Sequence, residues 1–269
     1  MAKTLSFKLS ALFILLAVFF TAPGVKAQQL SGNVFSYKSE PFTAVVVDKN
    51  TSTLYIVEMK NDTPEIIAKT SVLVGGGGGD KKVSGDMKTP EGVYYITGYL
   101  SPEQLRRAYG SVADDYGTGA FPLNYPNFFD RMSGKTGSGI WLHGKRVDRK
   151  EQSTRGCVAL ENDVLDDYKK YLKKGIPVVI TNGVSFEQRQ NYEVEKAFLK
   201  EKLDSLVASW SGLDFENFAS HYHIQFRSGS GENYAQYLGK KKTLMKLYPE
   251  RKIEISSVRS FKVKGVVIT

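Results

Sequence analysis

Residues 43–57 read TAVVVDKNTSTLYIV and decide the fold class of the first half of the chain. Two β-branched runs, residues 43–47 and 53–57, flank Asp48-Lys49-Asn50, which is a turn signal. Further strands are predicted over residues 66–74, 93–97, 139–142 and 176–180. Asn162 is a suitable N-cap for a helix over residues 163–174, which Gly175 would end. We therefore expect residues 42–183 to form a mostly antiparallel β domain with few helices, either a sandwich or a barrel.

The composition changes after Ser185. Apolar residues recur with a helical period over residues 186–210, and residues 214–221 and 234–247 predict two shorter helices. Residues 252–269 have the composition of two strands. Residues 184–269 are therefore expected to form a second, smaller α+β domain.

The first 27 residues have the layout of a secretory signal peptide. Lys3 and Lys8 precede the apolar run of residues 11–20, and Val25-Lys26-Ala27 offers small residues where a signal peptidase cleaves. The alternative is an uncleaved membrane anchor, although the run is short for a bilayer span. Residues 28–41 would then form an N-terminal segment. Loss of the three leader lysines would reduce the net charge from +9 to +6, which suits an anionic partner such as a cell wall or a membrane surface.

The counts of cysteine and histidine exclude several kinds of site. The single cysteine, Cys157, rules out a disulfide scaffold and a cysteine-based zinc site, and three histidines leave little material for a metal cluster. The five glycines at positions 75–79 lack the Lys-Ser/Thr pair of a phosphate-binding loop, so they predict a flexible loop between strands. An unpaired cysteine in an exported protein is a reactive thiol, an intermolecular partner or a buried apolar residue.

One cysteine and one histidine form the candidate site. His143 follows the strand predicted over residues 139–142, and Cys157 lies in the segment STRGCV, residues 153–158. A thiol attacks as the thiolate, so it needs a base or a positive surrounding, and His143 is a possible base. By spacing alone, a buried cysteine and an unrelated histidine explain the pair equally well.

The residues around this pair are suited to acyl-transfer chemistry. Gly144 allows a sharp turn, and a nearby carbonyl group would fix the imidazole tautomer. Gly156 allows the neighbouring N–H groups to converge on one point, as an oxyanion hole requires. The intervening loop is basic, which predicts a lowered thiol pKa and attraction for a substrate carboxylate. Its cations are Lys145, Arg146, Arg149 and Arg155.

His143-Gly144, a gap, and then STRGCV resemble the catalytic signature of the L,D-transpeptidase (YkuD-type) family. The segment GDMKTPEGVY, residues 85–94, is similar to a Gly-Asp-x-x-Thr-Pro-x-Gly segment of that family, and FPLNYPN, residues 121–127, to a segment of one branch. The resemblance covers about residues 42–180. It implies an exported enzyme that acts on peptidoglycan stem peptides through a cysteine acyl-enzyme.

The resemblance also implies roles for individual residues. Cys157 would be the nucleophile, His143 the base, and the Gly144 carbonyl the group that orients the imidazole ring. The backbone N–H groups of Arg155, Gly156 and Cys157 would form the oxyanion hole. The side chains expected to bind substrate are those of Tyr125, Asn127, Trp141, Arg146, Thr154 and Arg155, with a core position as the alternative for Trp141.

Two positions depart from the family pattern. Arg155 stands where many members carry histidine, and Ala159 where many carry Asn or Arg. Both changes leave the nucleophile and the base in place. They bear on the choice of substrate and acceptor.

The second half of the chain resembles a nuclear transport factor 2-like domain. A catalytic domain followed by such a domain is similar to the cell-shape-determining L,D-carboxypeptidases of helical bacteria. A complete domain of this type has further strands after Thr269, so the chain is expected to be a fragment or the domain to be reduced. His221 and His223 alternate on a possible strand, where both could face one side, but no third metal ligand is apparent.

The predicted activity is that of a peptidoglycan-modifying cysteine acyltransferase, and thiol chemistry of this kind needs no metal or organic cofactor. Its acyl-enzyme would pass to an amine, giving transpeptidation, or to water, giving carboxypeptidase action. A catalytically inert wall-binding module is the non-enzymatic alternative, and a sortase-like enzyme fits the motif spacing poorly. Peptidoglycan stem peptides, and no nucleic acid, are the expected partners. The expected location is the Gram-negative periplasm, without a membrane span once the leader is cleaved.

Overall fold

The structure is a computed structural model that describes residues 30–148, 150, 152–250 and 252–269. The expected leader, residues 1–27, lies outside the described residues. The largest sheet has five strands in the order β5-β4-β3-β10-β6, and β10 is parallel to β3 whereas the other neighbours are antiparallel. Its strands are β3 (Phe42–Asp48), β4 (Thr53–Lys60), β5 (Thr63–Ser71), β6 (Gly92–Tyr95) and β10 (Pro177–Thr181).

The strand predictions for this sheet are confirmed, with one shift. The strand expected over residues 66–74 is β5 and begins earlier, at Thr63. Asn61 and Asp62 both have a positive φ, as a tight hairpin turn requires, and this turn starts β5 directly opposite Lys60. The turn therefore determines the register of β5.

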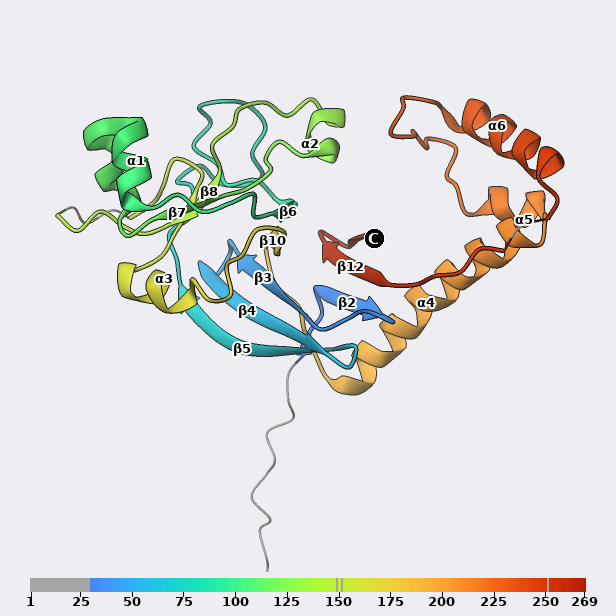
Figure 1. Ribbon diagram of the computed structural model, residues 1–269, viewed down its shortest axis with the longest axis horizontal. Helices are drawn as coiled ribbons and strands as arrows, with labels where there is room; N and C mark the ends of the chain where they lie inside the picture. Colours follow the sequence, from blue (N-terminus) through green and yellow to red (C-terminus); the bar gives the residue numbers. More distant parts are fainter. Residues whose placement is uncertain (1–29, 149, 151, 251) are drawn as a thin grey trace, which may run out of the picture.

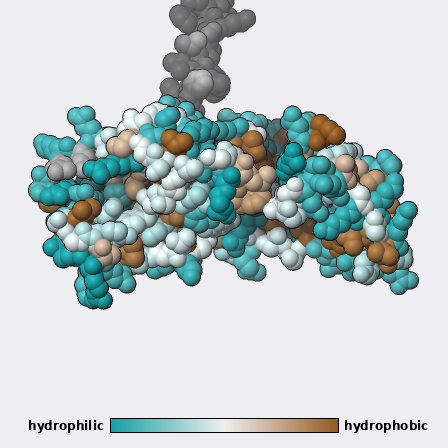
Figure 2. Space-filling model, turned by 90° about the horizontal axis from the view of Figure 1, so that it is seen from above, coloured by the Kyte–Doolittle hydropathy of each residue, from teal (hydrophilic) through white to brown (hydrophobic). Residues whose placement is uncertain are grey.

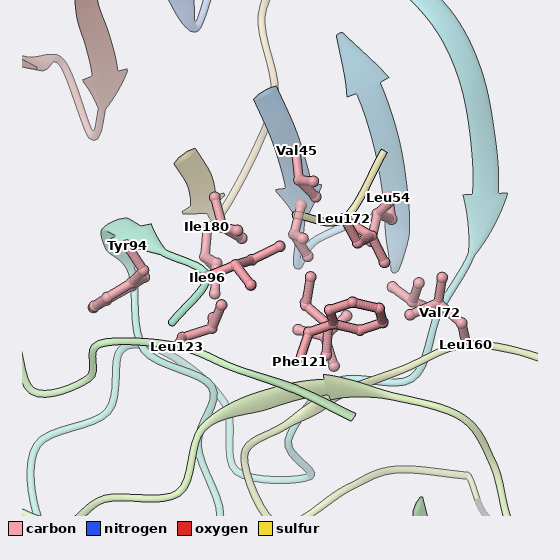
Figure 3. Packing of buried hydrophobic residues seen from close by; sticks show 14 of the residues in the cluster. Val45, Leu54, Val72, Tyr94, Ile96, Phe121, Leu123, Leu160, Leu172 and Ile180 are labelled. Carbon is pink, nitrogen blue, oxygen red and sulfur yellow. The ribbon is translucent and has the colours of Figure 1, made fainter. Parts of the chain in front are cut away.

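A second sheet covers one face of the first and makes a β-sandwich. It has the order β7-β8-β9 and consists of β7 (Ala120–Pro122), β8 (Trp141–His143) and β9 (Val158–Ala159), with β8 and β9 parallel. Val45, Leu54 and Ile180 from the large sheet pack toward Phe121 and Leu160, and all of these side chains are buried (Figure 3). The small sheet carries His143 on β8 and holds Cys157 immediately before β9.

Short helices connect the strands of the sandwich. They are α1 (Pro102–Tyr109), a 3₁₀ helix η1 (Gly110–Tyr116), α2 (Phe128–Met132) and α3 (Asn162–Tyr168). α1 and η1 were not predicted because their sequence is largely polar, and each buries a single side chain. The prediction that Asn162 is the N-cap of α3 is wrong. Glu161 is the N-cap, and the Asn162 side chain donates to the Lys145 carbonyl oxygen instead. The helix ends at Tyr168 instead of the predicted residue 174, and turns follow it.

The helices and strands predicted for the second half are confirmed. α4 (Arg189–Ser211) leads away from the sandwich to α5 (Phe215–Ser220) and α6 (Tyr234–Leu247), and the chain then returns (Figure 1). Apolar and aromatic side chains pack among these helices around Phe218, Leu238 and Met245. The face shown in Figure 2 is largely hydrophilic, with hydrophobic side chains in separate patches. No described helix has the length and apolar character needed to cross a membrane.

Strands from both ends of the chain form a third layer. β2 (Val34–Tyr37) pairs with β12 (Val258–Val263), which pairs with β13 (Val266–Ile268). Phe261 and Val263 of this layer pack against Val46 and Val179 of the large sheet. β1 (Leu30–Ser31) pairs in the same region with β11 (Phe186–Glu187). Both faces of the large sheet are therefore covered, one of them by residues far apart in the sequence.

An ion pair joins this third layer to the loop between β5 and β6. The Lys264 ammonium, in the β12–β13 turn, lies 2.7 Å from Glu91 and 3.3 Å from Asp80. Both carboxylates are at most 10% exposed and have a second lysine partner, Lys49 or Lys135. The pKa values of both carboxyl groups are below their usual range, because these hydrogen bonds and charges outweigh the effect of burial.

The expectation that His221 and His223 lie on one strand is wrong. His221 follows the last turn of α5, and its Nε2 lies 3.2 Å from Ser205 Oγ. His223 is in the following turn and accepts a hydrogen bond from the N–H of Gln225. Within the described ranges, no three histidine, cysteine or acidic residues are grouped as a metal would require.

Candidate active site

Cys157 and His143 line one cleft of about 480 Å³. Thr154 and Arg155 also line it, and further parts of the wall are formed by Lys81, Ser84, Gly85 and Met87. The structure therefore brings together four of the residues that the sequence nominated: His143, Thr154, Arg155 and Cys157.

His143 is buried and its ring orientation is fixed. The ring Nδ1 lies 2.5 Å from the Gly144 carbonyl oxygen. A carbonyl oxygen can only accept, so Nδ1 carries the proton and Nε2 of the neutral ring has a free lone pair. The Tyr116 ring packs edge-on against the imidazole, with the centroids 5.2 Å apart. Burial lowers the pKa of His143 to about 4, although the Gly144 carbonyl and the charge of Asp115 oppose this shift. The imidazole is therefore neutral at pH 7.

The Cys157 thiol is protonated in the free protein. It donates a hydrogen bond to the Gly139 carbonyl oxygen at 3.3 Å and accepts one from the backbone N–H of Trp141. Burial raises the pKa of the Cys157 thiol to about 11, against the effects of that N–H and of the Lys81 charge. A neutral thiol in the same cleft as a neutral imidazole is suited to proton transfer during attack, rather than to a preformed thiolate.

The prediction that the basic loop lowers the thiol pKa is wrong. Lys145 pairs with Glu161, and Arg146 pairs with Asp115 and Asp148, so these cations are neutralised by carboxylates. Arg149 lies outside the described residues. The cation whose charge does lower the pKa is Lys81, which the sequence analysis did not single out.

The backbone around Cys157 has a conformation that only glycine adopts easily. Gly156 has φ +126°, and a Cβ atom there would lie 2.7 Å from the Lys88 carbonyl oxygen. Thr154 Oγ1 donates to the Cys157 carbonyl at 2.7 Å and accepts from the Gly156 N–H at 3.1 Å. Of the three N–H groups expected in the oxyanion hole, those of Arg155 and Cys157 have no partner among the described residues.

Comparisons with known proteins agree with this geometry. The family model described as the L,D-transpeptidase catalytic domain, YkuD, matches residues 43–180. The chain belongs to this family. A comparison with curated proteins gave no match.

Two solved structures are similar over nearly the whole chain. One is Bd1075 of Bdellovibrio bacteriovorus, with 26% identity, a TM-score of 0.69, and coverage of 90% of this chain and 87% of that one. The other is a K307A mutant of the helical cell shape determining protein Pgp2 of Campylobacter jejuni. It has 26% identity, a TM-score of 0.66, and coverage of 88% of this chain and 78% of that one. The similarity therefore extends beyond the L,D-transpeptidase domain into the C-terminal helices.

The Gly-Asp-x-x-Thr-Pro segment of this L,D-transpeptidase-family chain forms the support of the cleft. The Asp86 carboxylate accepts from the Lys81 ammonium and from the backbone N–H groups of Lys82, Val83 and Lys88, at 2.7–3.2 Å. Thr89 Oγ1 accepts from Gly75 N–H at 2.7 Å and lies 3.4 Å from the Cys157 carbonyl oxygen. This segment therefore connects the cleft wall to the loop that carries Cys157.

The interpretation of the glycine run as simply flexible is wrong for its first three residues. A Cβ atom at Gly75 would lie 2.4 Å from the Met87 carbonyl oxygen, and one at Gly77 would lie 2.5 Å from that of Asp86. These glycines allow close packing against the segment that supports the cleft. Gly78 and Gly79 have open space around them.

Four of the nominated substrate-binding residues do not line the cleft. Tyr125 is buried in the sandwich core and donates to the Thr136 carbonyl oxygen. Asn127 caps α2 and donates to the Val93 carbonyl oxygen. Trp141 packs against Tyr109 and Tyr116 and is partly buried at the edge of the cluster formed by Leu105, Ala113 and Ala120. Arg146 is held by its two carboxylate partners.

Several residues that line the cleft were not indicated by any sequence pattern, among them Tyr116, Asp115 and Lys81. Tyr116 and Asp115 lie on the 3₁₀ helix that the sequence did not predict. A possible signal for Lys81 was its place beside the Gly-Asp-x-x-Thr-Pro segment. Its burial, at 3% exposure, depends on the salt bridge to Asp86 and could not be anticipated.

Proposed function

We propose that this chain cleaves the L,D amide before the terminal D-alanine of peptidoglycan tetrapeptide stems through a Cys157 thioester. The observation that carries the proposal is the shared cleft of Cys157 and His143, with the His143 tautomer fixed by the Gly144 carbonyl. Family membership supports peptidoglycan as the target and implies action outside the cytoplasm. Periplasmic export by the predicted leader is part of the proposal.

The raised pKa of Cys157 and the lowered pKa of His143 disfavour a preformed thiolate–imidazolium pair, so the thiol proton would move during attack. As Sγ attacks the amide carbonyl, the thiol proton moves to Nε2 of His143 and a tetrahedral oxyanion forms. The C–N bond then breaks, and the D-alanine amine leaves with the proton from His143. A thioester remains on Cys157, with a neutral imidazole beside it.

The thioester is resolved by the same groups in reverse. An incoming amine or water loses a proton to His143 as it attacks the thioester carbonyl. The C–S bond then breaks, and the sulfur regains its proton from the imidazolium. An amine acceptor gives transpeptidation, whereas water gives the tripeptide product of a carboxypeptidase.

Two observations support different acceptors. Membership of the L,D-transpeptidase family favours an amine. Similarity to the cell shape determining protein Pgp2 over 88% of this chain favours water, because the sequence of the second half resembles cell-shape L,D-carboxypeptidases. The carboxypeptidase candidate includes a proposed domain organisation. Residues 42–183 would form the catalytic domain, and residues 184–269 a nuclear transport factor 2-like domain.

The cleft also offers positive charge for an anionic substrate. Arg155 is exposed at the cleft and lies next in sequence to the Gly156–Cys157 loop, whereas the buried Lys81 is already paired with Asp86. A stem-peptide carboxylate near the scissile bond would be attracted to Arg155. The assembly of nucleophile, oriented base and cation argues against an inert wall-binding module.

The test is mass spectrometry of purified disaccharide-tetrapeptides incubated with residues 28–269 and, in parallel, with a Cys157→Ala variant. Tripeptide and free D-alanine formed only by the unmodified protein would show carboxypeptidase action. Cross-linked dimers joined between third stem residues, or exchange of an added D-amino acid, would show transpeptidation. Unchanged tetrapeptide with the unmodified protein would contradict the proposal.

A further inference from the structure

The side chain of Asn162 connects the segment that follows His143 to the segment that precedes Ala120, the strand partner of His143. Its Oδ1 accepts from the N–H of Lys145 at 3.0 Å and from the N–H of Thr118 at 3.3 Å. Its Nδ2 donates to the Lys145 carbonyl oxygen at 2.9 Å. The amide therefore holds both backbone polar groups of Lys145 and one of Thr118.

Two glycines make room for this amide. A Cβ atom at Gly144 would lie 2.2 Å from Asn162 Oδ1, and one at Gly117 would lie 2.0 Å from it. Side chains at these positions would displace the amide, so the Asn162 contacts and the two glycines depend on each other. The Gly144 N–H is also held by the Gly119 carbonyl oxygen at 3.2 Å, which ties the same segments together.

The geometry of one peptide group links Asn162 to the catalytic pair. The Gly144 carbonyl and the Lys145 N–H belong to the same planar peptide unit and point in opposite directions in a trans peptide. When Asn162 Oδ1 holds the Lys145 N–H, it therefore sets the direction of the Gly144 carbonyl. That carbonyl accepts from His143 Nδ1 and leaves Nε2 free to take a proton.

We propose that Asn162 is a positioning residue that fixes the His143 tautomer through the Gly144–Lys145 peptide group. This inference rests on the proposed role of His143 as general base. Asn162 lies after the nucleophile in sequence, at the first position of α3, and its side chain turns back toward Lys145 instead of capping that helix. Loss of the amide releases a peptide unit whose first residue is glycine, so the carbonyl can rotate away from Nδ1.

The expected effect of Asn162→Ala is a shift toward the Nε2–H tautomer, which cannot act as the base. The rate of the first turnover should fall roughly 10- to 100-fold, as when a partner that orients a functional histidine is removed. This loss is smaller than the roughly 10⁴-fold loss seen when a catalytic histidine is held wholly in the wrong tautomer.

The direct test is NMR of protein labelled with ¹⁵N-histidine at neutral pH, without substrate. The chain has three histidines, and a His143→Gln variant identifies the signals of His143. The unmodified protein should show His143 as the Nδ1–H tautomer, and Asn162→Ala should show a mixture or the Nε2–H form. Retention of the Nδ1–H pattern in Asn162→Ala would overturn the proposal.

Two further variants separate positioning from general loss of structure. Asn127→Ala removes an amide that caps α2 and bonds the Val93 carbonyl away from the cleft, so it should leave the tautomer unchanged. Asn162→Asp keeps an oxygen acceptor for the Lys145 N–H but lacks the Nδ2 donor to the Lys145 carbonyl, so it should retain more of the Nδ1–H form than Asn162→Ala. Loss of the Nδ1–H form in Asn127→Ala would also overturn the proposal.

The readouts distinguish this inference from the proposed function. If the unmodified protein leaves tetrapeptides unchanged, the proposed function fails, while the tautomer experiment still judges the role of Asn162. If the unmodified protein processes tetrapeptides and Asn162→Ala keeps both its tautomer and its rate, the positioning role alone fails.

Discussion

Replacement of His143 by glutamine should make folding stability less sensitive to acid. Burial lowers the pKa of His143 from 6.5 to about 4. Between these two values the unfolded chain binds a proton at this position and the folded chain does not. Stability is therefore lost as the pH falls through this window.

The magnitude follows from the two pKa values. At pH 4.5 the unfolded imidazole is almost fully protonated and the folded one is mostly neutral. This difference lowers the free energy of unfolding by about 2.5 kcal/mol relative to pH 7.5. In His143→Gln this contribution is absent, whereas all other ionisable side chains are kept.

The assay is urea denaturation of both proteins at pH 7.5 and pH 4.5. The unmodified protein should lose about 2.5 kcal/mol more than His143→Gln between the two pH values. The comparison subtracts the loss of the variant from that of the unmodified protein. Any effect of the substitution on stability that does not depend on pH is thereby removed. Equal losses in the two proteins would refute the burial and neutral state of His143.

Three further results are expected. Reaction of Cys157, the single cysteine, with iodoacetamide should be slow at pH 8 and rise steeply above pH 9, and half-maximal reaction below pH 8 would contradict the raised thiol pKa. Gly156→Ala should lower the free energy of unfolding by about 1–3 kcal/mol in urea denaturation, because the residue has a positive φ and an added Cβ would contact the Lys88 carbonyl oxygen. Gly78→Ala should leave this free energy unchanged, because Gly78 has open space around it. Lys264→Met should lower the free energy of unfolding by about 1 kcal/mol in the same assay, because the buried Asp80 and Glu91 carboxylates lose a half-exposed partner. Lys252→Met should leave it unchanged, because the Lys252 side chain is exposed.

Local sequence patterns predicted most of the sandwich. The β-branched runs of β3, β4 and β10 are buried on both faces or on alternate positions, so composition and turn signals were sufficient. The pairing of β2 with β12 could not be predicted in this way. It pairs Val34 with Phe261, which are far apart in the sequence, and the pattern of neither short strand indicates which strand it pairs with.

The presence of Cys157 and His143 in one cleft was predictable, but their electrostatic surroundings were not. Motif order and residue type were sufficient to nominate both residues. Their pKa shifts depend on burial, which arises from packing by Tyr116 and the loop that carries Lys81. A count of basic residues along the loop predicted the opposite shift for the thiol, because it shows neither the burial that raises the thiol pKa nor which cations have carboxylate partners.

The central claim is that Cys157 carries the acyl group, and intact-protein mass spectrometry during tetrapeptide turnover tests it most directly. Rapid acid quenching should reveal a protein species heavier by the acyl part of the stem, without the terminal D-alanine. Peptide mapping should place that mass on Cys157, and Cys157→Ala should show none. Turnover without a covalent species at Cys157, or an adduct that persists in Cys157→Ala, would contradict the account.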